Sequence, residues 1–199
     1  MSGRAVYFDL ETGGLDARHP DIQLAAIAID EASEARWAEL ETFEMKLAFD
    51  PVTADPKALE INHWTAEAWA QAEAPIRVVS RFTDFLDRHM SHEMINKFGR
   101  RYPVAKLIGH NAATFDGPRL QTLFKRHGRF LPADPRVRCT CQRALWWFDE
   151  HPDAPRPDNY KLATLCRYFG IEVAETHEAL ADVRLTIALA RALSQEVKS

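Results

Sequence analysis

An alternation of apolar and polar residues over positions 5–11 predicts the first strand of the chain. Asp9 and Glu11 belong to one alternate set, and the other set is apolar and consists of Val6, Phe8 and Leu10. Successive side chains of a strand point to opposite faces, so the two carboxylates lie on the same face. A glycine pair at positions 13 and 14 then ends the strand.

Two further runs predict strands beside the first. Residues 22–29 are apolar at nearly every position, which is typical of a strand buried on both faces. Residues 43–49 alternate apolar with polar positions, as expected for a strand with one face in water and a place nearer the sheet edge. The connections are short, so we expect the first three strands to form an antiparallel meander.

Helical periodicity dominates the rest of the chain. We expect helices over residues 58–72, 80–90, 120–127 and 162–169, and a last helix from about residue 176; short strands are expected at 106–109 and 137–140, and a proline-rich loop at 151–158. Three antiparallel strands followed by strand–helix units predict an α/β fold with a mixed sheet and helices on its faces.

Composition limits the class of protein. The 199 residues, 46% of them hydrophobic, are enough for one globular domain, which we expect to span 1–199. The sequence contains no apolar run of membrane-spanning length and no signal-peptide core, so we expect no membrane association and a cytoplasmic location. Cys139, Cys141 and Cys166 have no zinc-ligand spacing and are expected to be reduced, structural thiols.

Charge is distributed unevenly. The net charge is -4, yet residues 1–99 carry 9 Lys and Arg against 18 Asp and Glu, whereas residues 100–199 carry 16 against 11. From Lys97 to Arg143 there are 11 basic residues and two acids. This segment could bind a polyanion, or its basic side chains could point in several directions as ordinary solvated charges.

The paired acids have two interpretations. Asp9 and Glu11 held side by side in a partly buried strand repel each other, and a hard cation with oxygen ligands would relieve that repulsion. The alternative is a strand that runs into a solvated turn. Asp182 lies close to the apolar stripe of the last predicted helix, where an isolated carboxylate would be costly without a partner charge.

Three motifs occur in a fixed order along the chain. They are Phe8-Asp9-Leu10-Glu11-Thr12-Gly13-Gly14-Leu15, then His110-Asn111 with Phe115-Asp116, then His177 separated by four residues from Asp182. Together they resemble the histidine subtype of the DEDD 3′-to-5′ exonuclease family over essentially the whole chain. The resemblance implies a ribonuclease-H-like fold with a five-stranded mixed sheet.

The resemblance also implies a metal site and a catalytic base. It implies that two divalent cations, Mg²⁺ or Mn²⁺, are held by four acids, Asp9, Glu11, Asp116 and Asp182. His177 is the implied general base; without those acids it would be interpreted as a histidine at a helix start. Cys139-Thr140 stands where many members have Asp-Thr, a departure that concerns packing at a strand end.

The implied substrate contacts rest on fewer residues. By resemblance, Thr12 and Leu15 line the pocket for the terminal nucleotide. Phe115 stacks on a base or belongs to the core, and Asn111 contacts substrate or caps the helix that positions Asp116.

The expected function is hydrolysis of phosphodiester bonds at the 3′ end of single-stranded nucleic acid or frayed ends, releasing nucleoside 5′-monophosphates. DNA is favoured over RNA, and a polymerase is a candidate partner if the role is proofreading. Two alternatives are an exoribonuclease that degrades short RNA and a nucleic-acid-binding module that has lost catalysis. The second predicts a missing acid or histidine, and all five are present.

Overall fold

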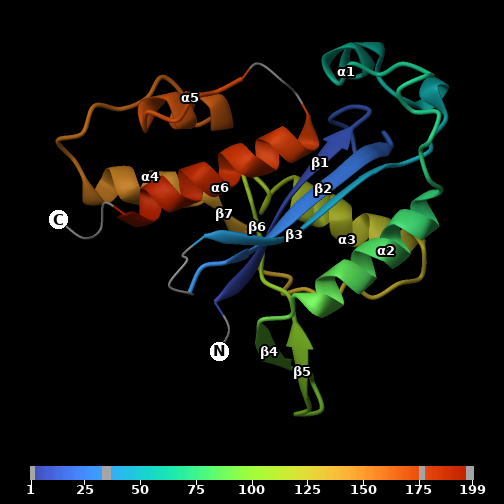
Figure 1. Ribbon diagram of the computed structural model, residues 1–199, viewed down its shortest axis with the longest axis horizontal. Helices are drawn as coiled ribbons and strands as arrows, with labels where there is room; N and C mark the ends of the chain where they lie inside the picture. The colour runs from blue at the N-terminus through green and yellow to red at the C-terminus, as the bar shows by residue number, and fades with distance from the viewer. Residues whose placement is uncertain (1–2, 33–36, 175–177, 196–199) are drawn as a thin grey trace.

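The computed structural model describes residues 3–32, 37–174 and 178–195. Its main sheet has five strands in the order β3-β2-β1-β6-β7 (Figure 1). Their bounds are Arg4–Thr12 for β1, Asp21–Asp30 for β2, Ala38–Lys46 for β3, Leu107–Gly109 for β6 and Arg138–Cys139 for β7. The first three strands are antiparallel, and β6 and β7 run parallel to β1. The predicted meander and mixed sheet are confirmed.

Strand β1 is at the centre of the sheet and is buried on both faces. Val6, Phe8 and Leu10 pack in the larger core cluster, with residues of α2 (Pro75–Arg88) and α3 (Asp116–Arg126). On the other face, Ala5 and Tyr7 pack against α6 (Ala179–Gln195). Because side chains alternate, Asp9 and Glu11 continue the face that α6 covers.

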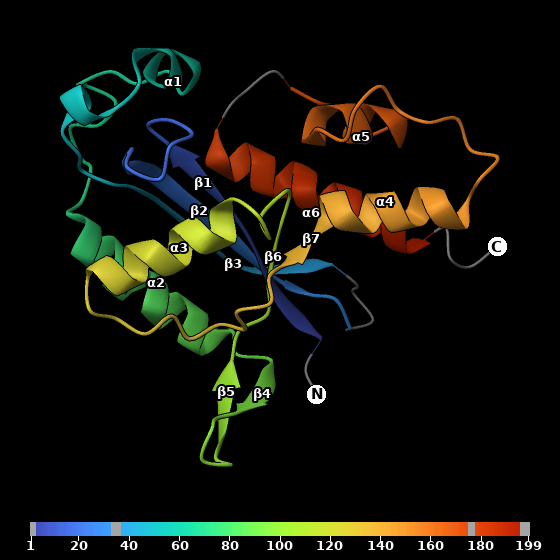
Figure 2. The same ribbon diagram turned by 180° about the vertical axis from the view of Figure 1, so that it is seen from behind.

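The helices form two layers around the sheet (Figures 1 and 2). α2 and α3 cover one face, and α6 covers the other. Two more helices, α4 (Thr140–Glu150) and α5 (Leu162–Tyr168), pack on α6 through a third apolar cluster. Among the described residues, no helix combines the length and the apolar character that crossing a membrane would require.

The helix predicted over residues 58–72 is wrong beyond its first turn. A short 3-10 helix (η1, Pro51–Thr53) leads to α1, which covers only Pro56–Ile61, and the chain continues in turns. Tertiary contacts override helix propensity here: His63 has a positive φ of 49°, and the Trp69 indole N–H donates to the carbonyl of Ile22 at 3.2 Å. The loose apolar stripe already gave this helix weak support.

A β-hairpin and a helix were absent from the sequence prediction. A second, two-stranded sheet consists of β4 (His92–Ile95) and β5 (Arg101–Val104), which form an antiparallel hairpin that projects from the body (Figures 1 and 2). Helix α4 follows β7 directly. The predicted helices over 80–90, 120–127 and 162–169 correspond to α2, α3 and α5, and residues 151–158 form the expected loop.

A buried ion pair joins α3 to β2. Arg119 Nε donates to Asp21 Oδ1 at 2.9 Å, and its other nitrogens donate to the carbonyls of Asp16 and His19. The two side chains are only 9% and 4% exposed. Burial raises the pKa of Asp21, and Arg119 opposes that rise. The guanidinium therefore holds α3 against the loop that follows β1.

Removing this cation should destabilise the fold. Arg119→Ala leaves a buried carboxylate without its partner, which costs about 3–5 kcal/mol in the free energy of unfolding. Thermal denaturation should show a Tm fall of roughly 6 °C or more for a chain of this size. Adding Asp21→Asn to the variant should recover part of the loss, and a single variant with the parental Tm would contradict this role.

Candidate metal centre and active site

Asp9 and Glu11 lie near the end of β1, where the sheet register shifts. A bulge between Glu11 and Thr12 breaks the pairing with β2, and the strand then ends at two glycines. Gly14 has a φ of 146°, and an added Cβ there would lie 2.1 Å from the His19 ring, so this close approach requires glycine. The turn thus leaves both carboxylates at the rim of the sheet rather than in its middle.

Asp182 reaches these two acids from α6. It lies in the first turn of that helix, between the buried residues Ala179 and Val183. Asp9, Glu11 and Asp182 each offer an oxygen, and the three oxygens lie within 4.8 Å of one another. All three side chains are half-buried. Packing of α6 on β1 therefore brings together carboxylates that are more than 170 residues apart in the sequence.

Asp116 is the first residue of α3 and is buried, with 5% of its surface exposed. The chain reaches it from β6 through a tight turn in which Gly117 N–H donates to the Ala112 carbonyl at 2.7 Å. Burial raises the pKa of Asp116 to about 7, against the opposing charge of Arg119. Its charge in turn raises the pKa values of Asp9 and Glu11, which shows that the fourth predicted acid belongs to the same electrostatic cluster.

The acids of β1 favour protonation in the absence of a cation. Burial raises the pKa of Asp9 well above its usual range, and the charges of Asp116, Glu11 and Asp182 raise it further. Burial raises the pKa of Glu11 to about 7, with added repulsion from Asp182 and Asp116. A cluster of this kind is stabilised by cations that prefer oxygen ligands, and carboxylates suit Mg²⁺ and Mn²⁺. The donor set therefore fits a divalent metal.

A pocket of about 460 Å³ lies beside the acids and contains several predicted substrate residues. Glu11, Thr12, Leu15 and Phe115 line it. Thr12 is buried and its hydroxyl donates to the Gly14 carbonyl at 3.1 Å, whereas Leu15 is 86% exposed. Phe115 is half-buried at this edge, so the alternative that placed it in the core is wrong.

Sequence reasoning missed the part of the pocket lining that α1 and its two caps supply. Lys57 and Asn62 line the same space from α1 and its C-cap. The Asn62 amide donates to the Thr12 carbonyl at 3.1 Å and to the Ala58 carbonyl at 2.9 Å. This link joins α1 to the end of β1 across 50 residues of sequence, and no local pattern could have revealed it.

Asn111 does not cap α3, so the capping prediction is wrong. The N-cap residue is Phe115, and no side chain in the described part of the chain donates or accepts a capping hydrogen bond there. Asn111 is exposed, has a positive φ of 56° and accepts a hydrogen bond from the Thr114 hydroxyl at 2.9 Å. Its side chain shapes the turn before the helix and does not line the pocket beside Glu11.

Two histidines complete the comparison with the sequence prediction. His177, the predicted base, lies outside the described residues. His110 had no predicted role; its Nδ1 lies 2.9 Å from the Thr140 hydroxyl and its Nε2 lies 3.0 Å from the Tyr160 carbonyl. Burial lowers the pKa of His110, which favours a neutral ring that joins α4 to the loop before α5. The three cysteines are free, as expected.

The acidic cluster at the rim of the mixed sheet is a candidate metal centre, and comparison of the sequence with protein families identifies the class of the chain. Residues 88–190 match the RNase_T family model, described as Exonuclease. That segment is just over half of the chain and includes Asp116, His177 and Asp182. The chain belongs to this exonuclease family.

The individual relatives agree with this family. DNA polymerase III PolC-type from Pediococcus pentosaceus is 27% identical over 187 residues, which are 92% of this chain and 11% of the polymerase. Exonuclease I from E. coli, in a complex with a dT13 oligonucleotide, aligns with 97% of this chain and 41% of its own, at 22% identity and a TM-score of 0.69. Exonuclease I from Methylocaldum szegediense aligns with 98% and 41%, at 21% identity and a TM-score of 0.75.

The structural likeness confirms the ribonuclease-H-like fold that the motifs implied. The chain spans about two fifths of the Exonuclease I chains and about a tenth of the polymerase. The comparisons therefore establish the family and the fold of this chain, and the chain corresponds to only one part of each of these larger relatives.

The repulsion in the acidic cluster has a measurable consequence for stability without metal. Glu11 keeps its proton in the folded state up to a pH of about 7 but releases it near 4.5 when unfolded. Its contribution to stability is therefore present below pH 4.5 and is lost as the pH rises through 7. In excess chelator, Glu11→Gln should exceed the parent in Tm by a margin that grows across this window, corresponding to about 1–3 kcal/mol.

The matched control is Glu67→Gln, which changes an exposed glutamate on the turns after α1. Its Tm should follow that of the parent at every pH. Added Mg²⁺ should stabilise the parent more than Glu11→Gln and so cancel the advantage of the variant. If the two melting profiles stay parallel from pH 4 to 8, Glu11 does not belong to a repelling cluster.

Proposed function

We propose that this chain is a metal-dependent 3′-to-5′ exonuclease that hydrolyses single-stranded DNA from its 3′ end and releases nucleoside 5′-monophosphates. The observation that carries the proposal is the convergence of Asp9, Glu11 and Asp182 within 4.8 Å, in a chain of the exonuclease family. We further propose that residues 1–199 form a single exonuclease domain. DNA is the proposed substrate because the relatives include a DNA polymerase and an enzyme bound to dT13.

The proposed metal ligands are Asp9, Glu11, Asp116 and Asp182, which would hold two Mg²⁺ or Mn²⁺ ions. When bound, these cations would supply an activated water and charge stabilisation at the leaving 3′ oxygen. The chain's own contribution is to fix four carboxylates on three elements: the central strand β1 and two helices, α3 and α6, that pack on opposite faces of the sheet. Rigid positioning of this kind is what an in-line displacement requires.

The proposed roles of the pocket residues follow from their position beside Glu11. Thr12 and Leu15 lie where the last nucleotide would enter, and Phe115 offers an aromatic ring in the lining of the same pocket. Stacking on an aromatic ring is tolerant of base identity, which suits an enzyme that removes every nucleotide in turn.

His177 is the proposed general base, and Asn111 is a proposed contact outside the pocket. A polymerase is a proposed partner, on the grounds of the PolC relative.

The proposal predicts metal dependence and strand polarity. Excess chelator should abolish hydrolysis of a 5′-labelled single strand, and Mg²⁺ or Mn²⁺ should restore it, because the acids alone leave water unactivated. The labelled strand should shorten one nucleotide at a time from the 3′ end. A circular strand is the control and should resist hydrolysis. Cleavage of the circle at the rate of the linear strand, or an undiminished rate in chelator, would overturn the proposal. The same assay with duplex DNA and with RNA measures the substrate preference.

The role of His177 predicts a loss of chemistry without a loss of binding. His177→Ala should lower the single-turnover rate roughly 10²- to 10⁴-fold, the usual range for general-base catalysis, while strand affinity is retained. The neutral imidazole is the active form, so the parental rate should rise with pH through the histidine ionisation and the variant should lose that rise. His151→Ala, which changes a histidine at the end of α4, is the matched control. A His177 variant with the parental rate and pH profile would exclude it as the base.

A further inference from the structure

The basic segment from Lys97 to Arg143 divides into paired and unpaired side chains. Six of its eleven cations form ion pairs, namely Arg101, Lys106, Arg119, Arg136, Arg138 and Arg143. Among the described residues, no ion pair is formed by the other five, Lys97, Arg100, Lys125, Arg126 and Arg129. The unpaired cations are confined to the β4–β5 hairpin and to the end of α3 with the loop that follows it.

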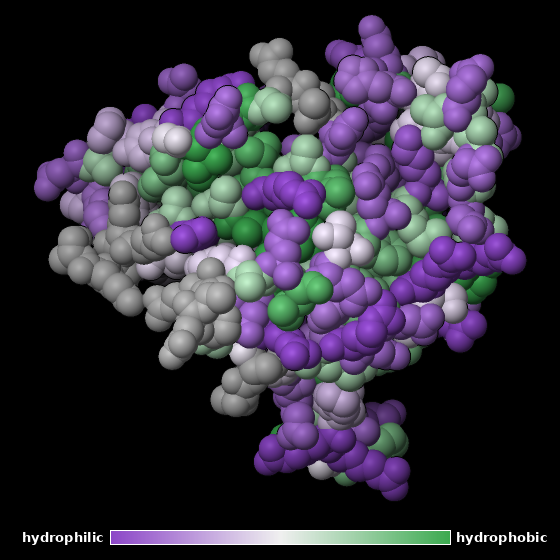
Figure 3. All heavy atoms as spheres, in the orientation of Figure 1, coloured by the Kyte–Doolittle hydropathy of each residue, from purple (hydrophilic) through white to green (hydrophobic). Residues whose placement is uncertain are grey.

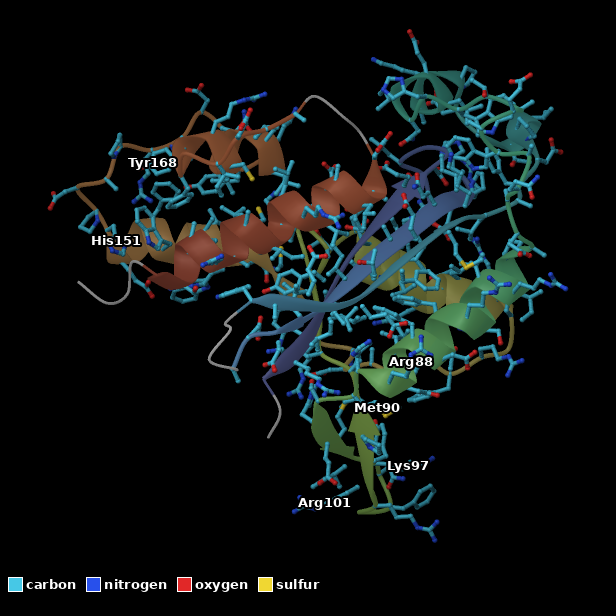
Figure 4. The ribbon with its side chains drawn as sticks, viewed as in Figure 1. Arg88, Met90, Lys97, Arg101, His151 and Tyr168 are labelled. Carbon is cyan, nitrogen blue, oxygen red and sulfur yellow. The ribbon has the colours of Figure 1, made fainter. Side chains whose placement is uncertain are left out.

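The two regions meet where the hairpin leaves the body. We define the hairpin–loop surface by six of their residues: Lys97, Phe98, Arg100, Lys125, Arg129 and Phe130. The hairpin projects from the body, and Lys97 lies on this projection (Figure 4). Hydrophilic side chains cover much of it (Figure 3). The rings of Tyr102 on β5 and Phe130 in the loop meet edge to face at 6.3 Å, and a hollow of about 430 Å³ lies between the two regions.

Two exposed aromatic rings accompany the unpaired cations. Phe98 is 76% exposed at the hairpin tip, where Lys97 Nζ lies 5.1 Å from its ring centroid. Phe130 is 68% exposed in the loop. Unpaired cations beside exposed rings are the combination that binds single-stranded nucleic acid, because the cations contact phosphates and the rings stack on bases. A double helix would hide its bases from such rings.

The surface is separated from the acidic cluster by the length of α3. Ten residue steps from Asp116 to Arg126, at about 1.5 Å each, give roughly 15 Å. Along the way, Thr122 and Arg126 line a small hollow with Ala17 from the loop after β1. Figure 2 shows α3 and its following loop between the end of β1 and the hairpin. At about 3.4 Å per stacked nucleotide, a stacked strand covers this distance with roughly four to five nucleotides.

We propose that the hairpin–loop surface binds single-stranded nucleic acid, beginning about four to five nucleotides on the 5′ side of the end held at the acids. This inference rests on the proposed function for the position of that end. The surface holds the strand by phosphate contacts and base stacking, and it takes no part in the chemistry. It supplies the attraction for a polyanion that the acidic cluster does not supply.

The first experiment measures binding without hydrolysis. In an Asp9→Asn background with chelator, fluorescence anisotropy measures the affinity for a labelled oligo-dT of about 20 nucleotides across a salt series. Phe98→Ala should weaken binding at least fivefold, since a base stack contributes about 1–3 kcal/mol. Replacing Lys97, Arg100, Lys125 and Arg129 together by Ser should lower the slope of log affinity against log salt by about 0.7 for every phosphate that these cations neutralise in the parent.

The matched control for charge is the double variant Arg167→Ser with Arg191→Ser. Both residues are exposed, on α5 and α6, and neither forms an ion pair among the residues that the structure describes. Its affinity should follow that of the parent at each salt concentration. If Phe98→Ala and the fourfold charge variant also bind as the parent does, the surface does not hold the strand and the proposal is wrong.

The second experiment separates this surface from the acidic cluster. In the active protein, both surface variants should raise KM for the long strand with little change in kcat, and they should leave hydrolysis of a trinucleotide unaltered because it cannot reach the surface. Equal losses on both substrates would overturn the proposal. A parent that binds the long strand through this surface but hydrolyses no strand would leave this inference standing and overturn the proposed function.

Discussion

Repulsion among carboxylates at the end of β1 is the constraint on which the rest of the structure depends. Asp9 and Glu11 occupy a strand that is buried on both faces, and Asp182 is brought to them by a helix with buried neighbours on each side. The apolar contacts of β1 and α6 oppose this repulsion and keep the acids together. Strain held by a surrounding core is typical of functional sites. The apolar core therefore holds the acidic cluster in a geometry that fits a divalent cation.

The periodicity of apolar residues predicted the strands in which burial follows the alternation of side chains. The alternation in β1 and the apolar run of β2 are confirmed because side-chain burial in a sheet repeats with the backbone. Helix α4 escaped prediction because residues 144–148 are apolar at every position, which hides its helical stripe in the sequence. Ala144, Trp147 and Phe148 are buried along that stripe, but Trp146 between them is 66% exposed. The turns after α1 resist prediction for the opposite reason, since Trp69 is fixed by a distant carbonyl rather than by its own segment.

The site was predictable in part for a different reason. Alternation alone placed Asp9 and Glu11 on one face, but the inclusion of Asp116 and Asp182 came from the resemblance, because their approach depends on how α3 and α6 pack. Asn62 shows the limit of both routes. Its amide supports the Thr12 carbonyl from α1, and neither a periodic pattern nor a family motif contains that contact.

The sequence is also a limited guide to charge. The number of basic residues in a segment does not show where unpaired positive charge lies on the surface. Asp134 is completely buried, and it pairs with both Arg136 and Arg138. Burial raises the pKa of Asp134, whereas the two arginines lower it. The arginines have the larger effect, so the pKa of Asp134 falls to about 2 and the carboxylate stays charged. Among the described residues, the cations of the Lys97–Arg143 segment that form no ion pair lie on the β4–β5 hairpin and at the end of α3 far from Asp116. An acidic centre repels the phosphates of any strand until cations bind, so attraction for a polyanion has to come from elsewhere on the surface. Internal pairing, rather than the number of basic residues, determines where that attraction lies.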